Sequence, residues 1–162
     1  MPGAVRYHAR MPRLLIVHHT PSPAMHDMLQ AVRDGATDDA IEGVEVVVRA
    51  ALAATAPDVM AADGYVLGTP ANIGYMSGAL KHFFDQIYYP CLEETVERPY
   101  ALYVHGSSDL EGARRAVQAV VTGLRWRRAQ ADVLVTGPPG RADLAACREL
   151  GAAMAAGLTL GG

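Results

Sequence analysis

A chain of 162 residues, 51% hydrophobic and 19% charged, is long enough for one globular domain with a sizeable core. The formal net charge of -3 includes no dense run of either sign, so electrostatics does not favour nucleic acid or an anionic membrane surface as the main partner. The sequence shows neither a stretch of about 18 apolar residues nor a secretory pattern, which predicts no membrane span and a reduced, cytoplasmic setting.

The chain ends and the cysteines give two further expectations. Residues 1–12 show no periodicity and are predicted to form a flexible tail, which leaves residues 13–160 as a single domain. The two cysteines, Cys91 and Cys147, have neither metal-ligand spacing nor the number that a disulfide framework needs. We expect both to be buried thiols.

The first half of the chain alternates between strand and helix patterns. Leu14–His18 is a short apolar run typical of a strand buried on both faces. Apolar residues then recur at helical spacing from Pro23 to Gly35, after a capping hydroxyl at Ser22. The β-branched residues of 44–50 predict a second strand, and Pro57 is placed to open a short helix through Ala62.

The second half repeats this alternation. The segment that starts at Ser77 has one apolar face and is predicted to be a helix ended by Pro90. Ser108 and Glu111 have the spacing of a capping box at the start of another helix, which runs to Leu124. The remaining predicted elements are strands over residues 64–70, 99–107 and 131–136 and a closing Ala-rich helix over residues 142–158.

Five strands that alternate with helices predict an α/β fold, because parallel neighbouring strands need crossover connections. At this length we expect a doubly wound five-stranded parallel sheet with helices on both faces. Ligands of such sheets lie beyond the carboxyl ends of the strands, where the strand order reverses. The loops after the first, third and fourth strands are therefore the candidate site.

The first of these loops joins a strand to a helix start, where free N–H groups and the helix dipole favour an anion. Thr20 and Ser22 add hydroxyls, and the amides of Thr20, Ser22, Ala24 and Met25 are expected to remain as donors. A plain capped helix start would explain the same residues equally well.

The second loop, "GTPANIGYMSGAL", is long for a connection between a strand and a helix. Asn72 offers a polar tip, and Ile73 and Tyr75 offer apolar or aromatic surface for a flat ring. Ser77 has a simpler explanation as the cap of the next helix. In the third loop, Gly106 and two serines precede a helix, which either capping or ligand contact would explain.

The segment "GTPANIGYMSGALKHFFDQ" resembles the flavin-wrapping segment of flavodoxin-like NAD(P)H-dependent FMN reductases and quinone oxidoreductases, and "LLIVHHTPSPAMHDML" resembles their first strand and phosphate loop. The resemblance implies a flavodoxin-like sheet of order 2-1-3-4-5. It also implies FMN with its phosphate on the first loop and its ring between the second and third loops. Carried over by position, the phosphate is held by Thr20, Ser22, Ala24 and Met25, and the ring is bordered by Thr69, Pro70, Ala71, Asn72, Ile73, Gly74, Tyr75, His105 and Gly106.

The same resemblance implies a reductase in which hydride passes from NADH or NADPH to the flavin N5 and then to a quinone or similar small-molecule acceptor. No side chain is then required as a catalytic nucleophile or acid. The chain has no G-x-G-x-x-G motif, so the nicotinamide is expected to be a transient co-substrate. The alternative is a flavodoxin-type electron carrier, although such carriers tend to be more acidic than this chain.

Two other features have simple interpretations. His18 and His19 are adjacent on a strand and so point to opposite faces, which argues against a metal site. The helix segment "HFFDQIYY" has more aromatic residues than one buried stripe needs, and predicts a homodimer face if Phe83, Tyr88 and Tyr89 are exposed.

Overall fold

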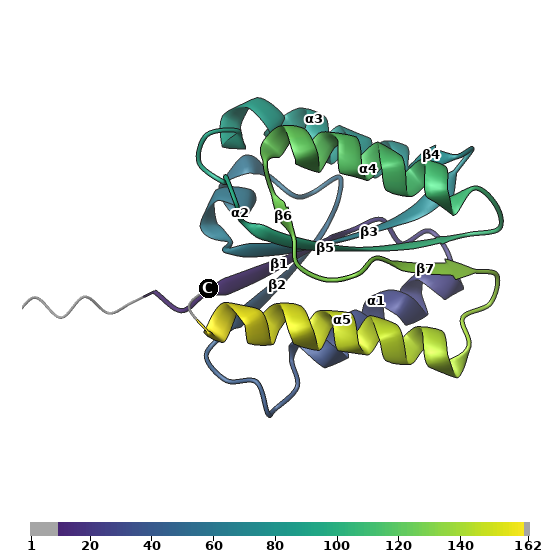
Figure 1. Ribbon diagram of the computed structural model, residues 1–162, viewed down its shortest axis with the longest axis horizontal. Coiled ribbons are helices and arrows are strands. Elements are labelled where there is room, and N and C mark those ends of the chain that lie inside the picture. The colour runs from purple at the N-terminus through teal and green to yellow at the C-terminus, as the bar shows by residue number, and fades with distance from the viewer. Residues whose placement is uncertain (1–9, 161–162) are drawn as a thin grey trace, which may run out of the picture.

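Strands and helices alternate along the chain in the computed structural model, which describes residues 10–160 (Figure 1). The strands are β1 (Arg13–His18), β2 (Glu45–Ala50), β3 (Gly64–Asn72), β4 (Tyr75–Met76), β5 (Pro99–Gly106), β6 (Arg127–Arg128) and β7 (Val133–Thr136). The helices are α1 (Pro23–Ala36), α2 (Ala56–Ala61), α3 (Gly78–Cys91), α4 (Leu110–Leu124) and α5 (Arg141–Thr159).

The main strands form one parallel sheet in the order β2-β1-β3-β5, with β6 and β7 both beside β5. This confirms the predicted fold class and order, with β7 as the fifth strand. Residues 129–132 split that outer strand: β6 pairs with the start of β5 and β7 pairs with its end. Crossover connections place α1 and α5 on one face and α2, α3 and α4 on the other (Figure 1).

Each face of the sheet has its own core. Against α3 and α4, the aromatic residues Tyr65, Phe84 and Trp126 pack together, and the rings of Tyr65 and Trp126 stack with centroids 4.1 Å apart. The core against α1 and α5 is more aliphatic and contains Met28 and Cys147. Cys91 and Cys147 are both buried free thiols, as expected.

Helices α1 and α5 are in close backbone contact. A Cβ atom on Gly35 of α1 would overlap the carbonyl of Arg148, and one on Gly151 of α5 would overlap the carbonyl of Val32. Only residues without a side chain allow this approach, so the glycine pair sets the distance between the helices. The helix that follows the first candidate loop is therefore held firmly against α5.

Three local predictions about element ends are wrong. Pro90 lies inside α3 and does not end it; it occupies the last turn, where its missing N–H removes only one late helical bond. The predicted capping box at Ser108 does not form, because Asp109 adopts a left-handed conformation (φ 52°) and caps α4 itself, while Glu111 pairs with Arg114 at 2.6 Å. The second loop is also more regular than expected, since β3 extends to Asn72 and β4 returns antiparallel to it.

The predicted homodimer face on α3 is not a continuous exposed surface. Phe83 is fully buried and Tyr88 packs against Gly123 of α4, so of the three aromatic residues only Tyr89 is largely exposed. The predicted tail lies mostly outside the described residues, but Arg10 pairs with Asp63 at 3.0 Å.

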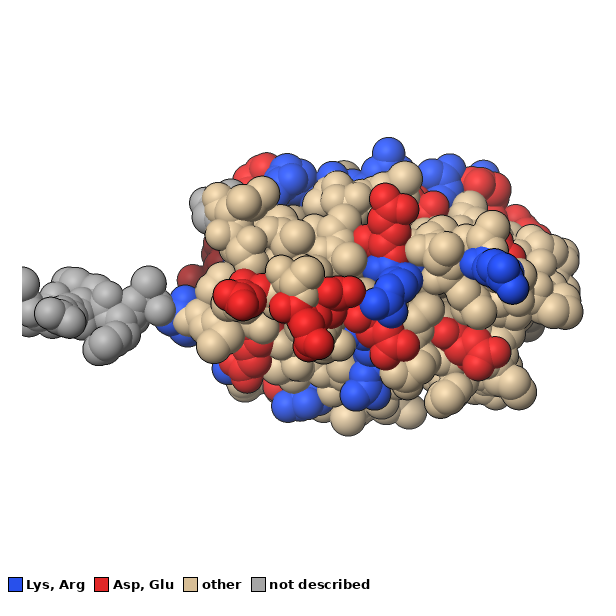
Figure 2. Space-filling view, turned by 90° about the horizontal axis from the view of Figure 1, so that it is seen from below, with Lys and Arg blue, Asp and Glu red and all other residues tan. Residues whose placement is uncertain are grey.

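Acidic and basic side chains are interspersed on the face formed by α1 and α5 (Figure 2), so that face presents no extended basic surface. Within residues 10–160, no helix is both long enough and apolar enough to cross a membrane.

Candidate functional site

The three loops singled out by sequence meet at one edge of the sheet, at the carboxyl ends of its strands. His18 of β1 is in register with Gly68 of β3, and the His19 amide donates to the Gly68 carbonyl at 3.0 Å. Pro70 is in register with His105 of β5. Because β1, β3 and β5 are adjacent and parallel, their outgoing loops lie side by side at this edge.

The first loop forms a helix start with free donors. Ser22 is the N-cap of α1, and its hydroxyl accepts from the Met25 amide at 3.2 Å. The Met25 amide is therefore not a free donor, contrary to expectation. Among the described residues no acceptor pairs with the amides of Thr20, Ser22 or Ala24, so these three N–H groups remain available beside the positive end of the helix dipole.

Two histidines, His18 and His19, lie where β1 ends and this loop begins. The Thr20 hydroxyl is 2.7 Å from Nδ1 of His18, which links the start of the loop to the end of β1. Burial lowers the pKa of His18 below its ordinary value of 6.5, so the imidazole is neutral at pH 7. Nδ1 of His19 is buried and has no hydrogen-bond partner among the described residues.

The second loop is a β-hairpin whose tip projects into solvent. Ile73 and Gly74 both have positive φ angles, 50° and 68°, as a two-residue hairpin turn requires. Ile73 is fully exposed and Tyr75 is 43% exposed, whereas Thr69 is buried and its hydroxyl accepts from the Ser77 amide at 3.0 Å. The side chains of Asn72, Ile73 and Tyr75, which were expected to face a flat ring, are exposed at the surface.

The hairpin is seated on the start of α4. A Cβ on Gly74 would overlap the Asp109 carboxylate, and one on Gly112 would overlap the Gly74 carbonyl. The Asp109 carboxylate accepts from the Gly112 amide at 3.2 Å and so caps α4 beside the hairpin. The left-handed conformations at Ile73 and Asp109 are local strain that this mutual contact maintains.

The third loop is fixed through His105. Its Nε2 lies 2.8 Å from the Gly137 carbonyl, and the Gly137 amide donates to Gly106 at 3.1 Å. Gly106 is buried, so it reaches a ligand only through its backbone. The loop after β7 therefore belongs to the same edge, although its turn residues "GPPG" do not distinguish it from an ordinary turn in the sequence.

One exposed apolar residue at this edge was also missed. The Ala51 amide donates to the His18 carbonyl at 2.8 Å, which places the turn after β2 beside the first loop. Leu52 in that turn is 68% exposed. A single leucine within the alanine-rich "AALAAT" gives no periodic signal, so only its position in the fold draws attention to it.

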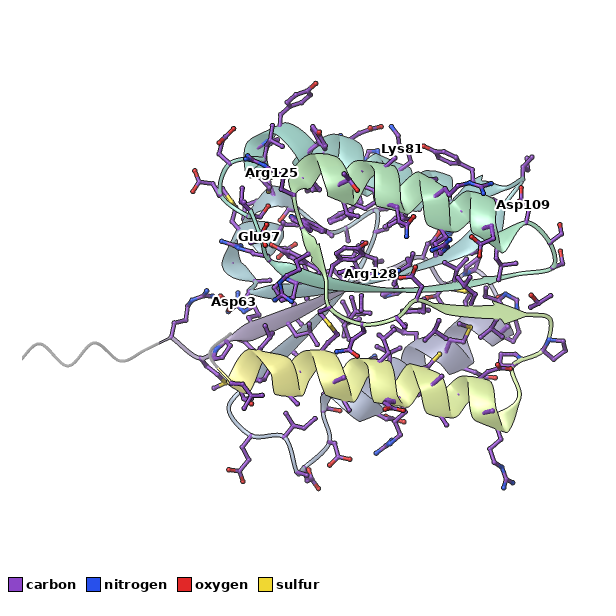
Figure 3. The ribbon with its side chains drawn as sticks, in the orientation of Figure 1. Asp63, Lys81, Glu97, Asp109, Arg125 and Arg128 are labelled. Atoms are coloured by element: carbon purple, nitrogen blue, oxygen red, sulfur yellow. The ribbon has the colours of Figure 1, made fainter. Side chains whose placement is uncertain are left out.

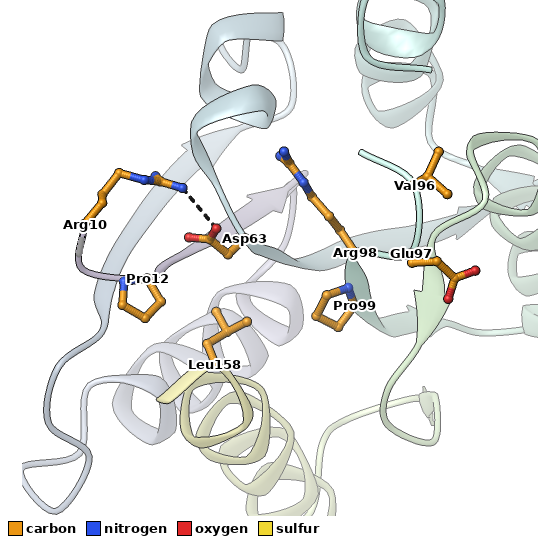
Figure 4. A pocket seen from close by; sticks show the side chains of 8 residues that line it. All are labelled: Arg10, Pro12, Asp63, Val96, Glu97, Arg98, Pro99 and Leu158. Carbon is orange, nitrogen blue, oxygen red and sulfur yellow. Dashed lines mark hydrogen bonds and ion pairs between the residues drawn. The ribbon is translucent and has the colours of Figure 1, made fainter. Parts of the chain in front are cut away.

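The opposite edge of the sheet is built differently. A cavity of about 380 Å³ opens there, and its walls include Asp63, Glu97 and Arg98 (Figure 4). Nη1 of Arg98 donates to the carbonyls of Met60 and Ala62 at 2.9 and 2.7 Å, so this nitrogen caps the end of α2 and is already bonded within the protein. Figure 3 shows Asp109 at one end of the molecule and Asp63 and Glu97 at the other.

Residues 10–160 contain no group of three or more His, Cys, Asp and Glu side chains arranged to hold a metal ion. The donors at the carboxyl edge are backbone amides and hydroxyls, which suit an anionic organic ligand better than a cation.

Comparison with known proteins bears on what this edge binds. The sequence model of the NADPH-dependent FMN reductase family matches residues 18–135, well over half of the chain. The chain belongs to this family. The match starts at the end of β1 and ends within β7, so it spans all three candidate loops of this FMN reductase family member.

Individual relatives agree with the family assignment. A flavodoxin from Aquifex aeolicus (strain VF5) is 35% identical over 77 residues, an alignment that covers 48% of this chain and 40% of that protein. This FMN reductase family member thus matches less than half the length of that curated relative.

Solved structures share the fold. A WrbA-like flavodoxin from Agrobacterium tumefaciens superposes with a TM-score of 0.76 at 18% identity over 92% of this chain and 98% of that one. A flavodoxin from the domain Archaea gives 0.76 at 17% identity over 91% and 99%.

Proposed function

We propose that the chain binds FMN at the carboxyl edge of its sheet, with the phosphate on the first loop. The unpaired amides of Thr20, Ser22 and Ala24 carry this proposal. Three N–H groups without a protein acceptor and the Ser22 hydroxyl, all at or next to a helix start, suit the acceptor oxygens and the charge of a phosphate monoester. Met25 contributes indirectly, since its amide orients the Ser22 hydroxyl and its side chain is buried in the core.

The second and third loops are proposed to border the flavin ring. Asn72, Ile73 and Tyr75 present their side chains at the hairpin, and the hydrogen bond to Gly137 holds His105 in place. The buried residues Thr69 and Pro70 act through their backbone, as do Gly74 and Gly106; Ala71 lies between them, half-buried. The ring then rests against an apolar surface that excludes water from one side.

The proposed activity is that of an NAD(P)H-dependent oxidoreductase. When bound, FMN supplies the hydride chemistry, between NADH or NADPH and a quinone or similar small-molecule acceptor. The protein contributes position and desolvation, and no side chain needs to act as a nucleophile or acid. The neutral His18 leaves the phosphate charge to be matched by amides and the helix dipole.

The second candidate is a flavodoxin-type electron carrier that does not turn over a substrate of its own. The flavodoxin from Aquifex aeolicus (strain VF5) favours this alternative by its name and its 35% identity over 77 residues. Both functions use the same FMN site and differ in how fast a nicotinamide reacts there.

The deciding experiment is a titration of the purified protein with FMN, followed by quenching of flavin fluorescence. Saturable binding with a rise in the melting temperature is the expected result. Absence of both would overturn the proposal. With FMN bound, steady oxidation of NADH or NADPH in the presence of a quinone identifies a reductase, and slow oxidation that the quinone does not accelerate identifies a carrier.

A further inference from the structure

Strand β2 is an open edge of the sheet. It pairs with β1 on one side, and within residues 10–160 no strand lies on its other side. Its three central residues, Val46, Val47 and Val48, are each half-buried and β-branched. Such an edge offers unpaired backbone groups to another strand unless something covers it.

The hydrogen bonds to β1 define which backbone groups point outward. The Glu45 amide donates to Pro12 and the Ala51 amide donates to His18, so odd-numbered residues of this strand bond to β1. Val46 and Val48 therefore direct their N–H and C=O groups away from the sheet. The only partner of these groups among the described residues is a side chain, since Nη1 of Arg49 donates to the Val48 carbonyl at 3.0 Å.

The charges on β2 are self-complementary. Glu45 and Arg49 lie on the same side of the sheet as Val47, and they are equally spaced before and after it. We propose that β2 pairs antiparallel with β2 of a second copy of this chain, with Val47 on the two-fold axis. In this register Glu45 of each copy lies opposite Arg49 of the other, and Val46 lies opposite Val48.

This register satisfies the outward backbone groups. Val46 and Val48 of opposite copies become hydrogen-bonded pairs, and each pair exchanges both of its N–H···O bonds. The Val47 pair and the two Glu45–Arg49 pairs occupy the non-hydrogen-bonded positions, where side chains of opposite strands are closest. A shift of one residue would set outward groups against inward ones, so the register is specified by the backbone as well as by charge.

The side chains of Glu45 and Arg49 on β2 can form these new pairs with the second copy. Arg49 is 3.7 Å from Asp58 and half-exposed, so its guanidinium can leave the Val48 carbonyl when an amide of the second copy takes that acceptor. Glu45 accepts from Arg13 through a single oxygen, Oε2, at 3.0 Å, which leaves Oε1 for the incoming Arg49. Antiparallel pairing also directs the two candidate flavin sites to opposite ends of the joined sheet, so dimerisation covers neither.

Sedimentation velocity or light scattering over a range of protein concentrations tests the proposal, with or without FMN. We expect the mean mass to rise with concentration toward twice that of the monomer. Glu45→Arg and Arg49→Glu should each raise the dissociation constant at least about tenfold, because each sets like charges opposite one another. The double variant Glu45→Arg/Arg49→Glu should restore association, since it recreates both pairs with their signs exchanged.

A backbone variant tests the same interface independently of charge. Val48→Pro removes an N–H that points outward and makes no bond to β1, so it should abolish association while the chain still folds, as circular dichroism would show. Val48→Thr keeps the N–H and the β-branched shape and should associate like the original chain. A monomer at every concentration would overturn the proposal. A dimer whose dissociation constant does not change in the β2 variants would overturn it as well. So would a dimer that dissociates when Tyr89→Ser is introduced on α3.

Discussion

The two edges of the sheet differ in how their polar groups are used. At the amino edge, where the parallel strands begin, two charged groups of the cavity wall already have protein partners: Nη1 of Arg98 donates to two carbonyls, and Asp63 accepts from the Arg13 amide at 2.8 Å and from Arg10. At the carboxyl edge, by contrast, the amides of Thr20 and Ser22 have no acceptor among residues 10–160. Cavity volume alone would indicate a ligand site at the amino edge, whereas the unpaired backbone amides indicate one at the carboxyl edge.

This difference suggests that the polar groups of the amino edge stabilise the fold and that those of the carboxyl edge bind a ligand. A donor with a protein partner contributes to folding, and a ligand that recruited it would first have to break that bond. An unpaired N–H group at a helix start is instead ready for an anion. Variants at the amino edge should therefore change the free energy of unfolding, and variants at the carboxyl edge should change ligand affinity.

The largest expected effect is at the amino edge. Arg98→Leu leaves the carbonyls of Met60 and Ala62 without their charged donor, and it should lower the free energy of unfolding by about 3 kcal/mol in a urea titration. The FMN affinity of the folded protein should not change. A variant that lost FMN affinity but kept its stability would reverse the assignment of the two edges.

A charge at the first loop should have the next largest effect, on affinity alone. Ser22→Asp keeps a good N-cap for α1 but places a carboxylate where the phosphate is proposed to sit. FMN affinity should fall about a hundredfold, or about 2.7 kcal/mol, with little change in the melting temperature. Ser22→Asn has nearly the same shape without the charge and should retain most of the affinity. Equal FMN affinities for the two variants would contradict the proposed position of the phosphate on this loop.

A smaller effect is expected at the hairpin tip. Ile73 is fully exposed and has a positive φ, so Ile73→Asn relieves backbone strain without losing buried surface. The free energy of unfolding should rise by about 1 kcal/mol in a denaturant titration, while FMN affinity falls because the apolar contact with the ring is lost. An unchanged free energy of unfolding in Ile73→Asn would show that the hairpin is not strained at this position.

The smallest effect concerns pH. Burial lowers the pKa of His18, so between that pKa and about 6.5 the unfolded chain binds the proton more readily than the folded chain does. The contribution to stability is fully present above about pH 6.5 and is lost as the pH falls through the lower pKa of the folded state. Because the side chain is only half-buried, the effect is small, and His18→Gln should remove this loss of stability toward acid pH, measured by urea unfolding between pH 5 and about 7.5.

The order of elements could be predicted from sequence because it depends on residue patterns that are local. Buried parallel strands such as Leu14–His18 appear as apolar runs, and their helices have periodic apolar faces. Helix ends were less predictable, since they depend on neighbours. Asp109 takes the capping role expected of Ser108 because the hairpin at Gly74 packs against it, a contact between residues 35 apart in sequence.

The candidate site was predictable as a set of loops but not as a set of side chains. The family resemblance implied that Thr69 borders the ring, and only the folded structure shows that its hydroxyl is bonded to the Ser77 amide and the Pro70 carbonyl. It likewise placed Gly74 at the border of the ring, and only the folded structure shows that the Asp109 carboxylate occupies the space that a side chain at Gly74 would need. Leu52 could not be found at all, because its place beside the first loop follows from strand order.

The stacked pair Tyr65–Trp126 has a practical consequence. Trp126 is the only tryptophan of the chain, it is 6% exposed, and its indole donates to the Thr95 hydroxyl at 2.8 Å close to the amino edge. Tryptophan emission therefore reports on the integrity of that end of the molecule, and flavin emission would report on the other end. One sample in one cuvette can thus follow unfolding and ligand release as two separate optical signals.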